Sequence, residues 1–565
     1  MIDYKPVDLP ERTVTVRTKS GTYVYLTQRV EYSSKLKCSR PKRIAIGKLN
    51  EKGMLIPNQN YFDLYGKPVE LDVPGERADT VSCGPFVVVD AIARKTQLMD
   101  VLESVFSEQW EKILDLATYM MMTENNVMQY FEDYGYHHAL FNESNFTDST
   151  IGRLFDNMNI KDMDLFIRAW VKMHADKDIY ISYDSTNMNC VAGNLELAEY
   201  GHAKDNPDLP QVNMSLGYNQ TGNKPLFYSL YPGSIIDNTE CEKMVERAKY
   251  YECENMGFIL DRGYFSIKNI RYFEKNGYDY ILMTKGNARF VQEAVEECQA
   301  ILRNGYTNYI DEHELYGMTL EKDLFGTGKT EYVHVYYDGI QAEKDKIIIN
   351  GRYKKMDEIM EGKVQRKTQR KEDVKTYEGY YKVKFDDNGY LFAYQRKEKK
   401  IKEMVNKVGY FVIVTSKKMD AAEALSIYRD RDAVEKTFRM EKSYLGFDVF
   451  RVHDTEKLES KVFISFVALI IRNEIYQALK PMYKKNRKEN TVPKVIREYE
   501  RLGITKLSDN KYHVRYSLTS RQKKILGAVG VTEKDYMDKV NKIVQVLNES
   551  YRIPVVTAQR DVFFV

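Results

Sequence analysis

The order of strand-like and helix-like segments between residues 179 and 283 is the feature that most restricts the fold of this chain. Three β-prone segments come first, at residues 179–183, 212–218 and 226–231, and a turn at 220–223 joins the last two. A helical pattern over 239–252, an apolar strand at 258–260, a helical pattern over 267–275 and a strand at 280–283 follow. This alternation indicates a sheet with helices packed against it.

Three strands, a helix, a strand, a helix and a strand is the element order of an RNase H-like core. We therefore predict an α/β catalytic core of this fold with a β-rich insertion. The predicted segments are an N-terminal β-rich module (1–94), a helical module (95–175), the first part of the core (176–300), the β-rich insertion (301–418), the second part of the core (419–480) and a helical C-terminal tail (481–565). Within the insertion, residues 332–337, 346–349 and 410–414 are predicted to be strands, and a basic stretch around 363–375 is predicted to be helical.

Composition excludes several classes of protein. A chain of 565 residues has room for three or four domains, each with its own core, and its net charge of only +3 says little about partners. No two of the six cysteines lie within four residues of each other, which excludes a zinc-knuckle spacing and fits reduced thiols. The N-terminus lacks a signal pattern, and the apolar run at 462–471 is shorter than the roughly 20 residues that span a bilayer. We expect a cytoplasmic protein with no membrane partner.

Two aspartates stand where apolar strands are predicted to end. Asp184 follows residues 179–183 and precedes a Ser-Thr-Asn run, and Asp261 follows residues 258–260 and precedes Arg262-Gly263. Binding sites of open α/β sheets gather at such strand ends. Aspartate is also a common turn residue, so neither position identifies a site by itself.

A predicted helix over about 421–445 supplies a third element. Four of its polar residues fall in a stripe about 60° wide at roughly 100° per residue: Tyr428, Arg431, Glu435 and Lys442. An apolar stripe borders it, which places the polar stripe beside the core. A solvated face with an Arg431–Glu435 ion pair would account for two of the four residues, but not for the tyrosine and the lysine.

The string Tyr428-x2-Arg431-x3-Glu435-x6-Lys442 resembles the YREK signature of DDE transposases of bacterial insertion sequences, in the group named for insertion sequence four. Asp261-Arg262-Gly263-Tyr264 resembles the second motif of that group, and Tyr183-Asp184-Ser185-Thr186 resembles the first. Residues 201–211 are similar to the stretch that follows the first aspartate, and the resemblance extends over about 175–480.

The resemblance implies a DNA transposase that cleaves the ends of a mobile element and joins them to target DNA. Asp184, Asp261 and Glu435 would be the catalytic residues and metal ligands, and Tyr428, Arg431 and Lys442 would bind DNA phosphates. Three adjacent carboxylates repel one another unless cations intervene, and oxygen ligands suit Mg²⁺ or Mn²⁺. Two ions about 3.5–4 Å apart serve both ends of an in-line displacement in such sites.

The expected partner is double-stranded DNA, both transposon ends and target, bound by a nucleoid-associated homodimer. No Walker motif is present, so we expect no nucleotide cofactor. Basic clusters at 363–375, 396–402 and 484–488 are candidate phosphate contacts, although such clusters are often only solvated faces. Within the first cluster the predicted contacts are Lys367, Arg370 and Lys371.

Two alternatives stay open at this level. One is an RNase H-like nuclease that cuts DNA without joining it, and the other is a catalytically silent, transposase-derived DNA-binding protein. A hairpin at the cleaved end is a further hypothesis, since some relatives hold a flipped base on a tryptophan of the insertion. Both tryptophans here, Trp110 and Trp170, precede Asp184. The candidate stacking surfaces are therefore tyrosines of the insertion, including Tyr332, Tyr336 and Tyr337.

Overall fold

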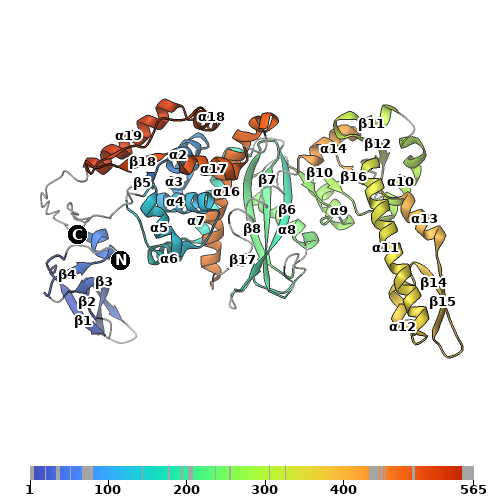
Figure 1. The fold of residues 1–565 in the computed structure, drawn as a ribbon, viewed down its shortest axis with the longest axis horizontal. Coiled ribbons are helices and arrows are strands. Elements are labelled where there is room, and N and C mark those ends of the chain that lie inside the picture. The colour runs from blue at the N-terminus through green and yellow to red at the C-terminus, as the bar shows by residue number, and fades with distance from the viewer. Residues whose placement is uncertain are drawn as a thin grey trace. The chain divides into compact units, whose positions relative to one another are not determined.

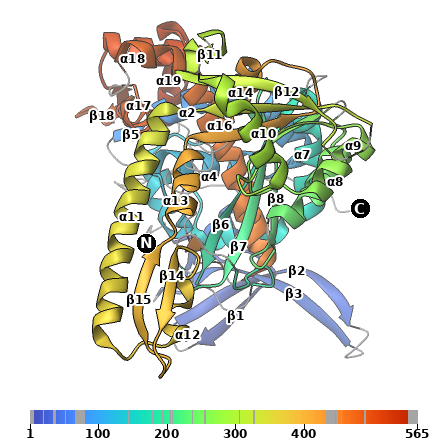
Figure 2. The same cartoon turned by 90° about the vertical axis from the view of Figure 1, so that its right-hand side faces the viewer.

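The computed structural model divides the chain into two compact units, Met1–Asn157 with Glu474–Val565, and Met158–Asn473. Figures 1 and 2 show their elements in two views. The structure describes residues 6–549 apart from 19–20, 34–37, 51, 66–79, 143, 176–178, 192–194, 202–205, 207, 236, 254–255, 304–305, 325, 327, 432–444, 446–448, 451, 453 and 487–489.

The first unit begins with a four-stranded antiparallel sheet in the order β1 (Thr13–Thr18), β2 (Gly21–Ser33), β3 (Cys38–Leu49) and β4 (Leu55–Pro57), followed by α1 (Gln59–Tyr65). Val24, Ile46 and Leu55 form its small core. Gly47 permits the close approach of β4, because a Cβ there would lie 2.1 Å from the Ile56 carbonyl oxygen. This sheet explains the β-prone pattern of the N-terminal residues.

Helices make up most of the rest of this unit: α2 (Gly84–Lys95), α3 (Leu98–Val105), α4 (Trp110–Thr123), α5 (Phe131–His137), α6 (Asp148–Asn157), α17 (Val492–Glu500), α18 (Ser520–Ala528) and α19 (Glu533–Glu549). A three-stranded sheet in the order β19 (Tyr512–Val514), β18 (Gly503–Lys506) and β5 (Thr80–Ser82) joins segments more than 400 residues apart. The C-terminal segment therefore shares a core with the N-terminal helices.

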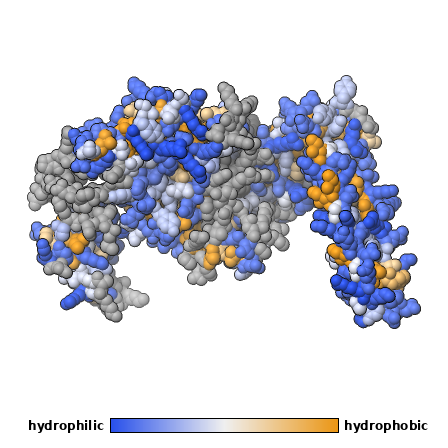
Figure 3. Space-filling view, in the orientation of Figure 1, coloured by the Kyte–Doolittle hydropathy of each residue, from blue (hydrophilic) through white to orange (hydrophobic). Residues whose placement is uncertain are grey.

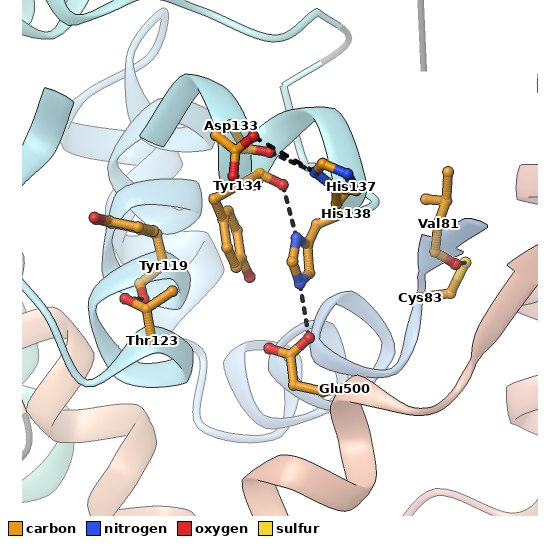
Figure 4. Close-up of polar contacts among 9 residues, drawn as sticks. All are labelled: Val81, Cys83, Tyr119, Thr123, Asp133, Tyr134, His137, His138 and Glu500. Atoms are coloured by element: carbon orange, nitrogen blue, oxygen red, sulfur yellow. Dashed lines mark hydrogen bonds and ion pairs between the residues drawn. The ribbon is translucent and has the colours of Figure 1, made fainter. Parts of the chain in front are cut away.

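A histidine reinforces this junction (Figure 4). The His138 Nε2 atom lies 2.7 Å from the Glu500 carboxylate, and its Nδ1 atom lies 2.7 Å from the Tyr134 carbonyl oxygen. The imidazole also stacks on the Tyr134 ring at 3.7 Å between centroids. One side chain thus connects α5 to α17 within the same unit.

The second unit contains a large mixed sheet. Its central strands run in the order β8 (Lys224–Pro232), β7 (Gln211–Asn219), β6 (Tyr180–Cys190), β9 (Gly257–Leu260) and β10 (Asp279–Met283). The β8–β7 and β7–β6 pairs are antiparallel, and the β6–β9 and β9–β10 pairs are parallel. The mixed α/β fold predicted for this region is confirmed, and the strand order is that of an RNase H-like sheet.

Helices α8 (Asp237–Tyr250) and α9 (Ile267–Asn276) connect β8 to β9 and β9 to β10. Helix α7 (Ile160–His174) is tied to β8 by a hydrogen bond of 2.9 Å from the Trp170 indole N–H to the Pro225 carbonyl oxygen. Helix α16 (Thr455–Asn486) packs on the same strand, with the Phe466 ring 5.1 Å from that of Tyr228.

By length and composition alone, part of α16 is apolar enough to cross a membrane. The span Thr455–Met482 contains an 18-residue window with a mean hydropathy of 1.5, and 78% of that window is buried inside the protein. Burial of this extent is typical of a core helix. The expectation that the protein has no membrane partner stays a prediction.

The segment between β10 and residue 418 extends the sheet. Strand β16 (Tyr410–Thr415) pairs with β10, and β13 (Glu331–Tyr337), β12 (Leu315–Lys322) and β11 (Tyr309–Ile310) follow outward. Helix α10 (Arg289–Leu302) precedes these strands. Between β13 and β16 the chain forms α11 (Gly339–Arg366), α12 (Lys371–Val374), a hairpin of β14 (Tyr381–Phe385) with β15 (Leu391–Arg396), and α13 (Glu398–Asn406). In Figure 2 the elements between β13 and β16 form an arm along α11.

The prediction of a strand at residues 346–349 is wrong, since they lie inside α11. A run of three isoleucines has no period that separates a strand from a helix. The Asp338 carboxylate caps the helix by accepting the Gln341 backbone N–H, and the buried residues Ala342, Tyr353 and Met360 recur at helical spacing.

A buried histidine connects three strands of the extended sheet. The His334 Nδ1 atom on β13 lies 2.9 Å from Thr319 Oγ1 on β12, and its Nε2 atom lies 3.0 Å from Thr415 Oγ1 on β16. Burial lowers the pKa of His334 from 6.5 to about 4. The imidazole is therefore neutral in the folded protein at neutral pH.

We expect His334 to make stability depend on pH. The unfolded chain protonates this group near pH 6.5 and the folded chain only near pH 4, so its contribution is present above pH 6.5 and is lost as the pH falls. The slope is about 1.4 kcal/mol per pH unit in this window. Thermal unfolding of wild type and His334→Gln between pH 4.5 and 7.5 should give converging Tm values at low pH. Parallel curves would contradict the assignment.

Candidate active site

The pairing of β6 with β9 brings the two predicted aspartates side by side. Paired residues of these parallel strands are offset by 77 positions, as in Ser182 with Ile259, and Asp184 and Asp261 are separated by the same 77 positions. The register therefore puts them at neighbouring positions on one face of the sheet, with adjacent strands about 4.8 Å apart.

Asp184 does not end its strand, contrary to the prediction. Strand β6 continues to Cys190 because β7 supplies an antiparallel partner for every residue from Ile181 to Asn189. On its other edge, the described partners of β6 are β9 up to Ser182 and β17 (Val449–Phe450) from Asn189 onward. Asp184 thus lies where the parallel pairing ends, not where the strand ends.

Local hydrogen bonds orient both carboxylates. Asp184 Oδ1 accepts the Ser185 backbone N–H at 2.9 Å, and Asp261 Oδ1 accepts the Gly263 N–H at 2.6 Å. The rings of Tyr183 and Tyr264, which lie close to the two aspartates in the sequence, meet edge to face at 5.7 Å. Burial raises the pKa of Tyr183 well above its ordinary value, so this support is uncharged. An aromatic contact therefore joins the residue before Asp184 to the loop that follows Asp261.

Helix α14 (Ala421–Arg429) packs on the same face of the sheet as the aspartates. Its Leu425 and Tyr428 share a core cluster with Ile259 and Ile281. Gln220 secures its C-terminal end, because the Gln220 side-chain amide donates to the Ile427 carbonyl oxygen and accepts from the Ser182 hydroxyl. Gln220 falls in the turn predicted at 220–223, and no pattern in the sequence indicates this role.

Arg431 joins this helix end to Asp184. Its guanidinium Nη1 lies 3.7 Å from Asp184 Oδ2, with the arginine side chain 9% exposed and that of the aspartate 20% exposed. The guanidinium also lies over the Tyr428 ring, 5.6 Å from its centroid. The Tyr428 hydroxyl contacts the Met283 sulfur at 3.6 Å. The structure therefore gathers Asp184, Arg431 and Tyr428 in one cluster.

The continuous helix predicted over 421–445 is not observed, because α14 ends at Arg429. Asp430 caps it, and the Arg431 backbone N–H donates to the Tyr428 carbonyl oxygen at 3.1 Å in a turn. Aspartate is a weak helix former, and a turn also satisfies the spacing of three between Tyr428 and Arg431. Glu435 and Lys442 lie outside the described residues, as do residues 202–205 of the stretch after the first aspartate.

Lys367, Arg370 and Lys371 lie elsewhere, at the far end of the arm. Lys367 follows the last residue of α11, and Lys371 is the first residue of α12. All three are exposed, and the Arg370 guanidinium lies over the Tyr390 ring. The 28 residues of α11 are about 42 Å long, so this cluster is remote from the aspartates.

Two cations of the basic cluster at 396–402, a candidate for phosphate contacts, have partners within the protein. Arg396 forms an ion pair with Asp357, and the Lys397 ammonium donates to the Glu378 carbonyl oxygen.

Tyr336 is fully buried, and its ring stacks on Phe411. It therefore has no free face for a flipped base, which corrects its place among the candidate stacking surfaces.

A cavity of about 220 Å³ lies beside the loop that follows Asp261. Its lining combines two cations with aromatic and apolar side chains: Arg262, Met283, Thr284, Gly286, Val291, Gln292, Val295, Lys407, Tyr410, Phe411 and Val412. The sequence offered no signal for it, because its walls come from β10, α10 and β16. Cations next to aromatic rings suit a nucleic-acid strand.

The two aspartates could supply some of the ligands of a divalent cation. The β6–β9 register, continued by two residues, sets Asp184 beside Asp261, and carboxylate oxygens are ligands that suit Mg²⁺ or Mn²⁺. Within the described ranges, no group of three or more histidine, cysteine, aspartate or glutamate side chains is arranged to hold a metal.

We expect Asp184→Asn and Asp261→Asn each to weaken Mn²⁺ binding at least about tenfold, or about 1.4 kcal/mol. Each substitution removes one charged ligand from the pair. Electron paramagnetic resonance of free Mn²⁺ measures this on the full chain. The matched control is Asp279→Asn, because Asp279 starts β10 and pairs with Lys417 at 2.7 Å. Unchanged affinity in either site variant would remove that residue from the ligand set.

Comparisons with known proteins bear on this geometry. No curated protein matches the chain. Among solved structures, a chain of the cryo-EM structure of the piggyBac transposase synaptic complex with hairpin DNA is similar at 8% identity and a TM-score of 0.33, over 73% of this chain and 67% of that one. So loose an overlap shows neither a shared fold nor a shared function.

A family model gives a direct assignment. Residues 177–471 match the model described as transposase DDE domain. The match includes both aspartates, α14 and the extended sheet, and it covers more than half of the 565 residues. The chain belongs to the DDE-domain transposases.

Proposed function

We propose that this transposase cleaves the ends of a mobile element and joins them to target DNA at one site built on Asp184, Asp261 and Glu435. The observation that supports the site is the 77-residue offset that makes the two aspartates neighbours. Both lie in the matched region, and Glu435 follows Arg431, which contacts Asp184, by four residues. Assignment to the group named for insertion sequence four is part of the proposal.

The proposed chemistry consists of two in-line phosphoryl transfers. In the first, water attacks the phosphorus at the element's end, the bond from phosphorus to the 3′ oxygen breaks, and a 3′-hydroxyl is released. In the second, that hydroxyl attacks a phosphodiester of the target, whose own 3′ oxygen leaves. Divalent cations, two in this proposal, would activate the nucleophile and stabilise the leaving oxygen.

Around this centre, Arg431, Tyr428 and Lys442 would hold the DNA backbone. Arginine suits this role because its planar fork matches two phosphate oxygens, whereas a lysine acts as a point charge. The Arg431 guanidinium lies near Asp184, so a phosphate that it holds would lie beside that carboxylate. The substrate would be double-stranded DNA in the cytoplasm, with two copies of the chain holding two ends.

Substitution of the proposed carboxylates tests the assignment. We expect Asp184→Asn, Asp261→Asn and Glu435→Gln each to lower cleavage of a labelled element end at least about 100-fold, or about 2.7 kcal/mol in the barrier. DNA binding, measured in Ca²⁺, should change little, and Asp279→Asn should cleave normally. A variant that keeps normal cleavage in Mg²⁺ is not one of the catalytic carboxylates.

The same preparations separate the alternatives. A supercoiled target plasmid added to pre-cleaved ends should yield joined products from the wild type alone. Cleavage without joined products would identify a nuclease on this fold. An absence of metal-dependent cleavage on cognate ends would identify a silent DNA-binding protein.

The tip of the arm is proposed to contact DNA phosphates. Each lost contact lowers the slope of log affinity against log salt by about 0.9, so neutralising Lys367, Arg370 and Lys371 to glutamine should lower it by about 2.7. Fluorescence anisotropy over 50–300 mM salt measures the slope.

The control replaces three exposed cations that already pair with carboxylates, on α8, α9 and α10: Lys243, Lys268 and Arg289. That variant should keep the wild-type slope. Equal slopes for the tip variant and the wild type would assign the tip cluster to solvent.

A further inference from the structure

Positive charge is concentrated in the N-terminal sheet. Residues 12–50, which contain β1, β2 and β3, include ten lysines and arginines and a single acidic residue, Glu31. The whole chain has a net charge of only +3, so the residues outside this segment are net negative. Hydrophilic residues are visible on the surface of this sheet in Figure 3. A basic segment in a chain that is otherwise net acidic indicates a polyanionic partner.

The part of β2 and β3 beyond the small core forms a two-stranded ribbon. The ladder of β1 with β2 reaches Leu26, and that of β4 with β3 starts at Gly47. Beyond these limits the described residues of β2 and β3 pair only with each other, and residues 28–32 and 38–43, here called the ribbon, are all exposed. A two-stranded hairpin is marginally stable in water, so the ribbon contributes little to the fold.

The register gathers cations on one face of the ribbon. Arg29 is paired with Lys42, and Glu31 is paired with Arg40. Paired residues share a face of a sheet, as do residues two positions apart on one strand, so these four side chains lie on the same face. Glu31 contacts Arg29 at 2.5 Å. Arg40 and Lys42 form no ion pair with another residue that the structure describes.

The pairing of Arg29 with Lys42 is unfavourable for the protein alone. Like charges directly opposite one another destabilise an antiparallel pair. The contact of Arg29 with Glu31 joins two exposed side chains, which stabilises a protein little. A ribbon that served only the fold would have opposite charges at these positions. The phosphates of a bound polyanion would offset the repulsion between the two cations.

The edge of β3 argues against a β-strand of another protein as the partner. Pro41 lacks the N–H group that a ladder uses, and charged side chains on an edge strand discourage pairing with another chain. Double-stranded DNA fits better, because its major groove, about 12 Å wide, admits a two-stranded β-ribbon. The phosphates beside the groove match the cations of the ribbon in charge.

We propose that the ribbon lies in the major groove of double-stranded DNA with its cationic face towards the DNA, where Arg29, Arg40 and Lys42 neutralise phosphates. This inference rests on the proposed function and assigns a DNA contact to the unit that does not contain the aspartates. Its tests measure binding in Ca²⁺, not cleavage. Ribbon variants that bind and cleave normally would reject the ribbon contact alone, and a wild type that binds through the ribbon without cleaving would reject the proposed function alone.

The salt dependence of binding counts the phosphate contacts. Replacement of Arg29, Arg40 and Lys42 by glutamine should lower the slope of log affinity against log salt by about 2.7, or about 0.9 for each contact. Fluorescence anisotropy of a labelled duplex measures the slope. The control variant with three cations replaced on α8, α9 and α10 loses the same charge and should keep the wild-type slope. An equal slope for the ribbon variant and the wild type would overturn the proposal.

Thermal unfolding separates a binding role from a structural one. Because the ribbon variant lacks the repulsion between Arg29 and Lys42, its Tm should be no lower than that of the wild type. Circular dichroism measures both the Tm and the secondary structure. A lower Tm with lost strand signal would make weaker binding a consequence of misfolding and count against the proposal.

Competition identifies the class of partner. Double-stranded RNA has a deep, narrow major groove that the ribbon cannot enter, so an RNA duplex of the same sequence should compete at least about tenfold less well than DNA. The ribbon variant should discriminate less between the two. Vesicles that contain phosphatidylserine should bind the wild type and the ribbon variant equally. Preferred binding of RNA, or a loss confined to vesicle binding, would assign the ribbon to another partner and overturn the proposal.

Cys38 provides a probe within the ribbon. It is paired with Ser33 and is exposed, whereas the other five cysteines are buried. Bound duplex DNA should slow the alkylation of Cys38 by a maleimide several-fold. The control is Gly527→Cys in a Cys38→Ser background, because that helical glycine of α18 has open surroundings, and its alkylation rate should not change. Equal protection at both positions, or none at Cys38, would overturn the proposal.

Discussion

The parallel pairing of β6 with β9 is the constraint on which the site depends. A backbone ladder, with no contribution from the side chains it positions, makes Asp184 and Asp261 neighbours. Because the period of a strand is two, the same register turns both carboxylates to one face. A slip of one residue would turn Asp184 to the other face, so the buried residues that hold the register also hold the site.

The contacts around the two aspartates follow from that register. Ile259 faces α14, and the helix packs there through Leu425 and Tyr428. Gln220 then ties the helix end to β6, which brings Arg431 to Asp184. The cluster is therefore assembled by packing and capping.

The extended sheet gives the arm a rigid base. His334 links three strands, and the Tyr336 hydroxyl donates to the Ala421 carbonyl oxygen at the start of α14. Strand β13 thus supports the site through α14 and leads directly into α11. A helix of 28 residues that starts from such a base can present a surface far from the aspartates, the basic tip of the arm.

The sequence by itself determined the order of the core strands and the position of Asp261, because apolar runs, turn residues and helical periods are local properties. The motif residues also identified the family. Only the tertiary structure decided that Asp184 lies within a strand, that α14 ends at Arg429 and that residues 346–349 are helical. These outcomes depend on partners distant in the chain: β7 prolongs β6, Gln220 holds the end of α14, and the β14–β15 hairpin covers one side of α11.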